Sequence, residues 1–264
     1  GNGAFNDPEA WDKFRKMDAQ FMPENKLNGA KRYGSRNTDW GPWPKDEEEE
    51  ETIDFKSVSY AEEALTRKPD KPFFLACGIF KPHSPFFAPP KYHALYEAGV
   101  DMPVLKKDDW EDLPTGAAKL MKAKKWFWTG MESLESKRPG SYRRFVQAYA
   151  ACCSFGDASV GRLIEALDRS GQAGNTIIVL WSDHGFHLGE KEHIEKFALW
   201  EKANHVPLII VDPRKGKSAG KVCSSPVDLS ALYPTLLDLC GLPANPMNDG
   251  ISVAKQVSDP TRAI

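Results

Sequence analysis

An acidic and a basic side chain stand next to each other where a predicted buried strand ends. Asp183 and His184 follow residues 176–181 with only Ser182 between, and that run of apolar and β-branched residues is typical of a strand inside a core. Gly185 then allows the chain to turn. A carboxylate oxygen and an imidazole nitrogen side by side could hold a divalent cation. Asp183 could equally accept backbone hydrogen bonds in a simple turn, and these two residues alone leave both interpretations open.

More charged side chains follow this pair than a segment beside a core strand usually carries. Lys196 comes thirteen residues after Asp183, and its ammonium group could neutralise negative charge or donate a proton to a leaving oxygen. The other charged or titratable residues of this stretch are His187, Glu190, Lys191, Glu192, His193 and Glu195.

A second candidate group follows the apolar run at residues 73–79, which we expect to be a strand buried on both faces. Lys81 and His83 come just after it, and Pro82 and Pro85 stiffen the loop on either side of His83. Both candidate groups would then lie at the carboxyl ends of strands, where α/β sheets bind their ligands. A lone loop histidine is more often structural, so the residues alone do not assign a function to His83.

Segments whose apolar residues recur at helical spacing lie between the predicted strands. Residues 57–67 are predicted to form a helix capped by Ser57 or Ser59, residues 89–98 a short helix, and residues 141–170 a long one. A strand at 206–211 is followed by a helix that residues 225–228 introduce and Gly241 ends. A helix between two apolar strands is typical of a parallel sheet, so the pattern predicts an α/β fold with a mostly parallel sheet flanked by helices.

The segment at residues 99–140 is predicted to be irregular and holds a cluster of basic and aromatic residues. Its members are Lys122, Lys124, Lys125, Trp126 and Trp128. They could contact an anionic sugar through charge and ring stacking. They could also belong to an amphipathic helix that packs its tryptophans, which is the interpretation we favour.

The bulk composition excludes several classes of protein. The net charge of −2 over 264 residues gives no reason to expect a nucleic-acid partner. No apolar run approaches the ~20 residues that cross a bilayer, so no transmembrane segment is expected. The five cysteines lack the spacing of a zinc site or a disulfide framework, and the acidic run at 46–51 is typical of a solvated surface.

Several motifs in a fixed order carry a resemblance to a known family. They are P-F-F-L-A-C-G at 72–78, K-P-H at 81–83, S-D-H-G-x-x-L-G-E at 182–190, Lys196, and H-V-P-L-I-I at 205–210. Together they resemble the sulfatases of the alkaline-phosphatase superfamily, most closely the iduronate-2-sulfatase branch. The resemblance runs over residues 72–242, and residues 36–42 are similar to a segment of bacterial members that could line the substrate pocket.

The resemblance implies a fold, a reaction and a role for each candidate residue. It implies an alkaline-phosphatase-like α/β fold and hydrolysis of a sulfate ester on a sulfated sugar or polysaccharide. Asp183 and His184 would be metal ligands, for Ca²⁺ or alternatively Mg²⁺. Lys196 and His83 would be catalytic. Lys81 and His193 would bind substrate, and the family habit suggests a periplasmic or secreted protein.

The family's nucleophile has no counterpart in these residues. Family members attack sulfur with a formylglycine made from Cys or Ser in C/S-x-P-S-R, and none of the five cysteines fits this motif. We expect that motif, and the paired Asp residues that complete the family's metal site, to lie upstream of Gly1. The fold would then lack its first strand, and this chain alone would bind metal poorly and be inactive.

We expect a single partial catalytic domain over residues 1–264. Residues 1–50 would be an irregular loop region, 51–242 the α/β core and 243–264 a truncated C-terminal segment. Two alternatives to a sulfatase stay open. One is a phosphoester or phosphonate hydrolase of the same superfamily, and the other is a degenerate, non-catalytic binding module that kept the fold.

Overall fold

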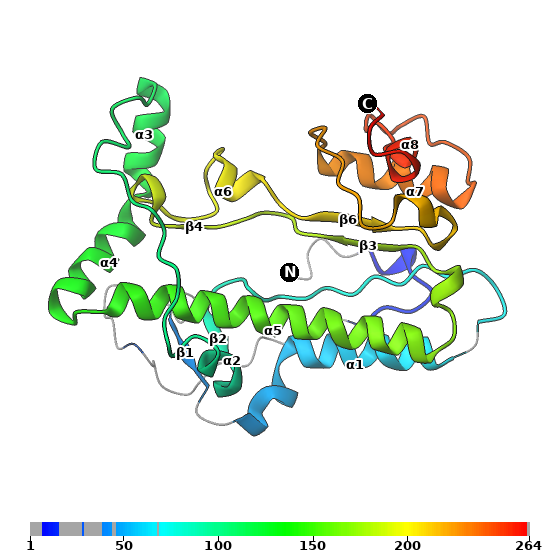
Figure 1. Cartoon of the computed structure of the whole chain (residues 1–264), viewed down its shortest axis with the longest axis horizontal. Helices are drawn as coiled ribbons and strands as arrows, with labels where there is room; N and C mark the ends of the chain where they lie inside the picture. Colours follow the sequence, from blue (N-terminus) through cyan, green and yellow to red (C-terminus); the bar gives the residue numbers. More distant parts are fainter. Residues whose placement is uncertain (1–6, 16–27, 29–38, 44–45, 68, 263–264) are drawn as a thin grey trace. The chain divides into compact units, whose positions relative to one another are not determined.

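The computed structural model describes residues 7–15, 28, 39–43, 46–67 and 69–262, which form two compact units (Figure 1). The first unit comprises Gly1–Ser170 and Leu188–Ile194, and the second comprises Gly171–His187 and Glu195–Ile264. The helices are α1 Ile53–Thr66, α2 Pro90–Ala94, α3 Thr115–Lys124, α4 Trp126–Lys137, α5 Ser141–Arg169, α6 Glu201–Asn204, α7 Leu232–Cys240 and α8 Ala254–Ser258. The strands are β1 Trp40–Pro42, β2 Phe86–Ala88, β3 Ile178–Trp181, β4 His187–Leu188, β5 Ile194–Glu195 and β6 Leu208–Val211.

The long helix α5 is the centre of the first unit. Its apolar residues recur at helical spacing as predicted, and Phe145 and Phe155 are buried on its core face. Helix α1 packs along α5 through the predicted face that contains Val58 (Figure 1). However, α1 begins earlier than predicted, because the Thr52 hydroxyl, and not Ser57 or Ser59, accepts the Phe55 N–H at 3.1 Å and caps the helix.

A short parallel ladder joins two distant segments of the first unit. Strands β1 and β2 pair with Trp40 opposite Phe86. Both rings lie 5.2 Å from the ring of Phe145, centroid to centroid, so the ladder packs on α5. This packing fixes the start of β2, which directly follows the loop that carries Lys81 and His83. Residues 36–38 of the predicted pocket segment lie outside the described residues.

The predicted strand at residues 73–79 is wrong. The segment is irregular, and Phe74 is 68% exposed with its ring stacked 5.8 Å from that of Trp11. An apolar run becomes a strand only where a neighbour supplies a hydrogen-bonding ladder, and none of the described strands pairs with this segment. The predicted strand–helix–strand unit in this part of the chain is therefore not formed.

The region predicted to be irregular, residues 99–140, instead contains α3 and α4. Phe127, Trp128, Met131 and Leu134 form one buried face of α4, while Trp126 stays 46% exposed. The Trp128 ring meets Tyr142 of α5 edge-on at 5.5 Å. The structure thus supports the amphipathic-helix interpretation for Trp128, and the mixture of Lys and Trp obscured the helical period.

The second unit contains the strand that leads into the Asp183 motif. Strand β3 pairs with β6 antiparallel, with Trp181 opposite Leu208. Among the described strands the sheet pairs are therefore mixed, parallel for β1–β2 and antiparallel for β3–β6. The α/β class itself is confirmed, and no helix among the described residues is long and apolar enough to cross a membrane.

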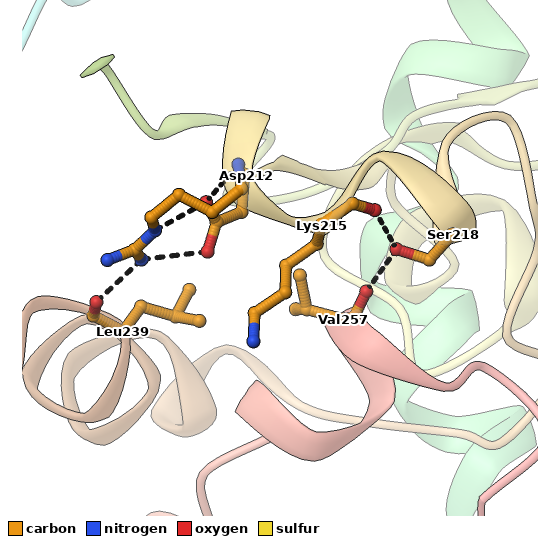
Figure 2. Close-up of polar contacts among 6 residues, drawn as sticks. Asp212, Lys215, Ser218, Leu239 and Val257 are labelled. Carbon is orange, nitrogen blue, oxygen red and sulfur yellow. Dashed lines mark hydrogen bonds and ion pairs between the residues drawn. The ribbon is translucent and has the colours of Figure 1, made fainter. Parts of the chain in front are cut away.

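Polar contacts tie the end of β6 to the last helices of this unit, as Figure 2 shows. Arg214 forms two hydrogen bonds of 2.8 Å with the Asp212 carboxylate and donates a third to the Leu239 carbonyl of α7. Ser218 donates to the Val257 carbonyl of α8 at 2.6 Å. As predicted, α7 ends at Gly241, whose φ of 67° is a left-handed cap.

Candidate active site

A sharp turn presents Asp183 and His184 directly after β3. The Ser182 hydroxyl donates to the His184 carbonyl at 2.8 Å, and the Gly185 N–H donates to the Ala203 carbonyl at 2.7 Å. A Cβ atom at position 185 would lie 2.1 Å from the Lys202 carbonyl oxygen, which only glycine avoids. The close approach of these two backbones therefore fixes where the turn points its side chains.

Lys196 reaches the imidazole of His184. The two atoms Lys196 Nζ and His184 Nε2 are 2.9 Å apart, and His184 Nδ1 is 2.8 Å from the Gly185 carbonyl oxygen. The carbonyl can only accept, so Nδ1 carries the proton and Nε2 accepts from the ammonium group. The imidazole is thus oriented by two hydrogen bonds.

Asp183 completes a small polar cluster with these two residues. Its Oδ2 atom is 3.8 Å from His184 Nε2, and its side chain is 75% exposed. A carboxylate, an imidazole and an ammonium group therefore converge within the second unit. Such a cluster can bind an anion through Lys196 and a cation through Asp183 and His184.

The donor set fits part of a divalent-cation site. Asp183 offers an oxygen and His184 a nitrogen, but no group of three or more His, Cys, Asp or Glu side chains suited to a metal occurs in the described part of the chain. Ca²⁺ takes about six to eight oxygen ligands. In addition, the Lys196 ammonium group occupies the position at Nε2 that a metal would take, so metal binding through that atom requires Lys196 to move.

The loop at 81–85 holds His83 in a defined orientation. The His83 N–H donates to the Phe80 carbonyl at 2.9 Å, and His83 Nδ1 is 2.7 Å from the Ser84 carbonyl oxygen. Its Nδ1 therefore carries a proton in the same way as that of His184. The half-buried ring of His83 packs against Phe80 with 4.8 Å between the ring centroids.

Lys81 is the first residue of this loop, and it is almost fully buried. Its Nζ donates to the Pro85 carbonyl at 2.6 Å, and burial lowers the pKa of its ammonium group. Asp54 of α1, also buried, accepts the Phe80 N–H, and burial raises the pKa of its carboxyl group. A Cβ atom at Gly156 would lie 3.1 Å from the Lys81 carbonyl oxygen, so this glycine allows α5 to approach the loop. Lys81 thus contacts its own loop, and a role in substrate binding stays a prediction.

His193, which the resemblance predicts to bind substrate, is fully buried in the first unit. Asp109 accepts from both the backbone N–H of Lys191 at 3.1 Å and its ammonium group at 2.8 Å. The Trp110 indole N–H donates to the Lys191 carbonyl at 3.0 Å. Lys191 and Glu192 have φ values of 53° and 51°, a conformation that these contacts hold. Nothing in the sequence pattern pointed to Asp109 or Trp110.

The structure thus brings three of the six predicted site residues together. Asp183, His184 and Lys196 form one cluster in the second unit. Lys81 and His83 share a loop of the first unit, and His193 lies elsewhere in the sequence of that unit. Their predicted roles in catalysis and binding stay predictions.

Comparison with known proteins identifies the relatives of the chain. A family model described as sulfatase matches residues 11–242. A sulfatase of Formosa agariphila is 38% identical over 233 residues, which cover 85% of this chain and 43% of that protein. Human iduronate 2-sulfatase is 31% identical over 215 residues, or 66% of this chain and 37% of that protein.

A solved structure supports the same fold. The phosphonate monoester hydrolase of Silicibacter pomeroyi is similar with a TM-score of 0.63 and 27% identity, over 76% of this chain and 41% of that chain. The predicted alkaline-phosphatase-like fold and the resemblance to iduronate 2-sulfatase are confirmed. The chain spans less than half the length of each of these three relatives.

Proposed function

The chain belongs to the sulfatase family, and from this premise we propose that the protein hydrolyses a sulfate ester carried by a sugar or polysaccharide. The observation that carries the proposal is the contact of Lys196 with His184 beside Asp183. It places a cation, an oriented imidazole and a carboxylate together, and the motif that supplies them is the one that resembles the family.

Lys196 would act on the sulfate group itself. Its ammonium group is an N–H donor and a full positive charge, which stabilises the negative charge that develops on the sulfate oxygens and the leaving oxygen. The same group can hand a proton to the leaving oxygen. His184 holds the amine in place through a bond of 2.9 Å.

His83 would supply a second polar contact to the sulfate. Its Nδ1 proton is committed to the Ser84 carbonyl at 2.7 Å, so Nε2 is the atom that can bind a proton and then donate to an anion. Lys81 and His193 are proposed to support substrate binding, through the position of the His83 loop and of the 188–194 segment respectively. We also propose that the chain is a single partial catalytic domain, with a loop region at residues 1–50, an α/β core at 51–242 and a C-terminal segment at 243–264.

Asp183 and His184 are the residues proposed to hold a divalent cation, Ca²⁺ or alternatively Mg²⁺. Once bound, the cation would polarise the sulfate oxygens as a Lewis acid. A formylglycine nucleophile, as in the family, is also proposed for the whole protein. The residues described above then bind and orient the sulfate and handle the proton of the leaving group.

Replacement of Lys196 tests the proposal. We expect Lys196→Ala in the full-length protein to lower kcat for a sulfated sugar about 10²–10⁴-fold, because charge stabilisation and proton donation are lost together. The exposed Lys221→Ala is the matched control and should stay within about twofold, since surface changes far from such features have small effects. Unchanged turnover in Lys196→Ala would remove Lys196 from the mechanism.

Hydrolysis of a phosphonate or phosphate ester is the second candidate function. The similarity to a phosphonate monoester hydrolase, with 27% identity, favours it. Both reactions need cationic groups around a tetrahedral anion, so the cluster alone does not distinguish them. The ratio of kcat/KM for a sulfate monoester to kcat/KM for a phosphonate monoester distinguishes the two functions. The absence of turnover with either ester would favour the non-catalytic binding module.

A further inference from the structure

A small pocket of about 140 Å³ opens on the first unit beside the segment that follows the Asp183 motif. The residues that line it include the basic Lys106, Lys107 and Lys191 and the acidic Glu192. Leu105, Trp128 and the backbone of Gly189 form the apolar part of the wall. We call this site the basic pocket. Its positive charge stands out in a chain whose net charge is −2.

Two of the charges in the basic pocket are already neutralised. Lys191 pairs with Asp109 at 2.8 Å and lies 3.6 Å from Asp112, while Glu192 pairs with Lys125 of the neighbouring helix boundary. The two lysines that remain in the lining are Lys106 and Lys107, of which Lys106 interacts electrostatically with Asp109. Both are exposed, and neither forms an ion pair with any residue in the described ranges.

The wall of the basic pocket is held rigidly. Lys125 lies 5.5 Å from the ring centroid of Trp110, and Trp110 in turn donates to the Lys191 carbonyl. A Cβ atom at Gly189 would lie 2.8 Å from the Trp128 ring and 2.5 Å from the Tyr142 hydroxyl, so the backbone at this position needs glycine to pack against them. A site that is organised before its ligand arrives loses less entropy on binding.

We propose that the basic pocket binds one anionic substituent, a sulfate or a carboxylate, of an acidic sugar residue in the substrate. Its volume is below the roughly 300 Å³ at which pockets begin to enclose a whole small ligand, so it suits a single substituent. Lys106 and Lys107 bind the oxygens, and the exposed Leu105 faces the sugar ring. The inference rests on the proposed function for the identity of the substrate as an acidic carbohydrate.

The order of residues in the chain supports a link to the proposed reaction. Gly189, Lys191 and Glu192 stand between His184 and Lys196, so at most five residues connect the pocket wall to either catalytic candidate. The basic pocket would select acidic sugars over simple sulfate esters, because a simple ester carries no second anionic group.

A binding measurement on two double variants tests this proposal. The protein is titrated with a defined sulfated tetrasaccharide that also carries uronate carboxylates. We expect Lys106→Gln with Lys107→Gln to raise Kd roughly tenfold, because two charged contacts at an exposed site are lost together. The matched control is Lys13→Gln with Lys71→Gln, two exposed lysines outside the pocket, which should leave Kd within about twofold.

The desulfated tetrasaccharide separates the two sources of negative charge. A tenfold difference between wild type and the Lys106/Lys107 variant that persists with this probe assigns the pocket to the carboxylate, and a difference that disappears assigns it to the sulfate. Equal Kd values of the wild type and the Lys106/Lys107 variant for the sulfated probe would overturn the proposal.

Turnover of a small aryl sulfate ester separates this inference from the proposed function. The ester has no second anionic group, so its kcat/KM should be equal in wild type and in the Lys106/Lys107 variant. If no sulfate ester is hydrolysed but the variant still loses affinity for the tetrasaccharide, the proposed function fails and the basic pocket stands. If the esters are hydrolysed and the tetrasaccharide binds both proteins equally, only the basic pocket fails.

Discussion

The contact between Lys196 and His184 shows how two basic side chains can share one site. His184 donates its Nδ1 proton to the Gly185 carbonyl, and its Nε2 atom lies 2.9 Å from the Lys196 ammonium group and accepts from it. The imidazole therefore acts as an acceptor that orients the ammonium group. A single residue, Gly185, makes this geometry accessible, since any side chain there would meet the Lys202 carbonyl.

At the same scale, removal of the Lys81 amine should measurably lower the free energy of unfolding. Lys81→Met keeps the buried volume but leaves the Pro85 carbonyl without its donor, so we expect a loss of about 1–3 kcal/mol in the free energy of unfolding. The measurement is urea denaturation at pH 7. Lys71→Met, at an exposed position, should change stability by less than about 0.5 kcal/mol.

The same two variants distinguish support of the loop from direct binding of substrate. If Lys81 acts by holding the His83 loop, the His83 imidazole resonances should shift in Lys81→Met without substrate and stay unchanged in Lys71→Met. Unperturbed His83 resonances together with weaker substrate binding would instead support the predicted direct role of Lys81.

At the scale of elements, the first turn of α5 depends on a residue from the preceding helix. Gly140 at the N-cap has no side chain to offer, and Glu135 of α4 accepts the N–H groups of Gly140 and Tyr142, each at 2.8 Å. The Tyr142 and Gly140 N–H groups lower the pKa of the Glu135 carboxyl below its usual 4.5. The Glu135 carboxylate of α4 thus caps the N-terminus of the next helix, α5.

Glu135→Gln should lower stability at neutral pH by about 0.5–2 kcal/mol, the usual size of a lost N-cap. Because the folded pKa is lowered, the contribution of Glu135 is complete above pH 4.5 and is lost as the pH falls through that lowered value. The melting temperatures of wild type and variant should therefore converge at acidic pH. Glu132→Gln, exposed on the same helix, should show no such convergence.

Local pattern was enough to predict α5, the end of α7 at Gly241 and the turn at Gly185. The apolar spacing of α5 and the left-handed cap of α7 lie within the elements themselves, whereas the glycine at 185 is required by a contact with the more distant Lys202. Residues 73–79 carry an equally clear apolar run, yet a strand also needs a partner ladder that the run does not encode. The anchoring of Lys191 by Asp109 could not be predicted for the same reason, since 82 residues separate the two partners.

At the scale of the whole molecule, the affinity for a divalent cation shows whether the full-length protein supplies further ligands besides Asp183 and His184. Two ligands leave most of the coordination of Ca²⁺ to other groups, and the described residues contain no cluster of three suitable side chains. A cation that binds only the folded protein raises the free energy of unfolding by RT ln(1 + [Ca²⁺]/Kd), so binding appears as a higher melting temperature.

We expect Ca²⁺ to raise the melting temperature of the full-length protein and a chelator to reverse the rise. Asp183→Asn should abolish the shift, because it removes the anionic oxygen ligand, while Asp249→Asn, an exposed carboxylate elsewhere in the second unit, should keep it. Lys196→Ala should increase the shift, since its ammonium group competes with the cation for His184 Nε2. An equal shift in Asp183→Asn and wild type would place the cation elsewhere and leave Asp183 as a residue that only shapes the turn.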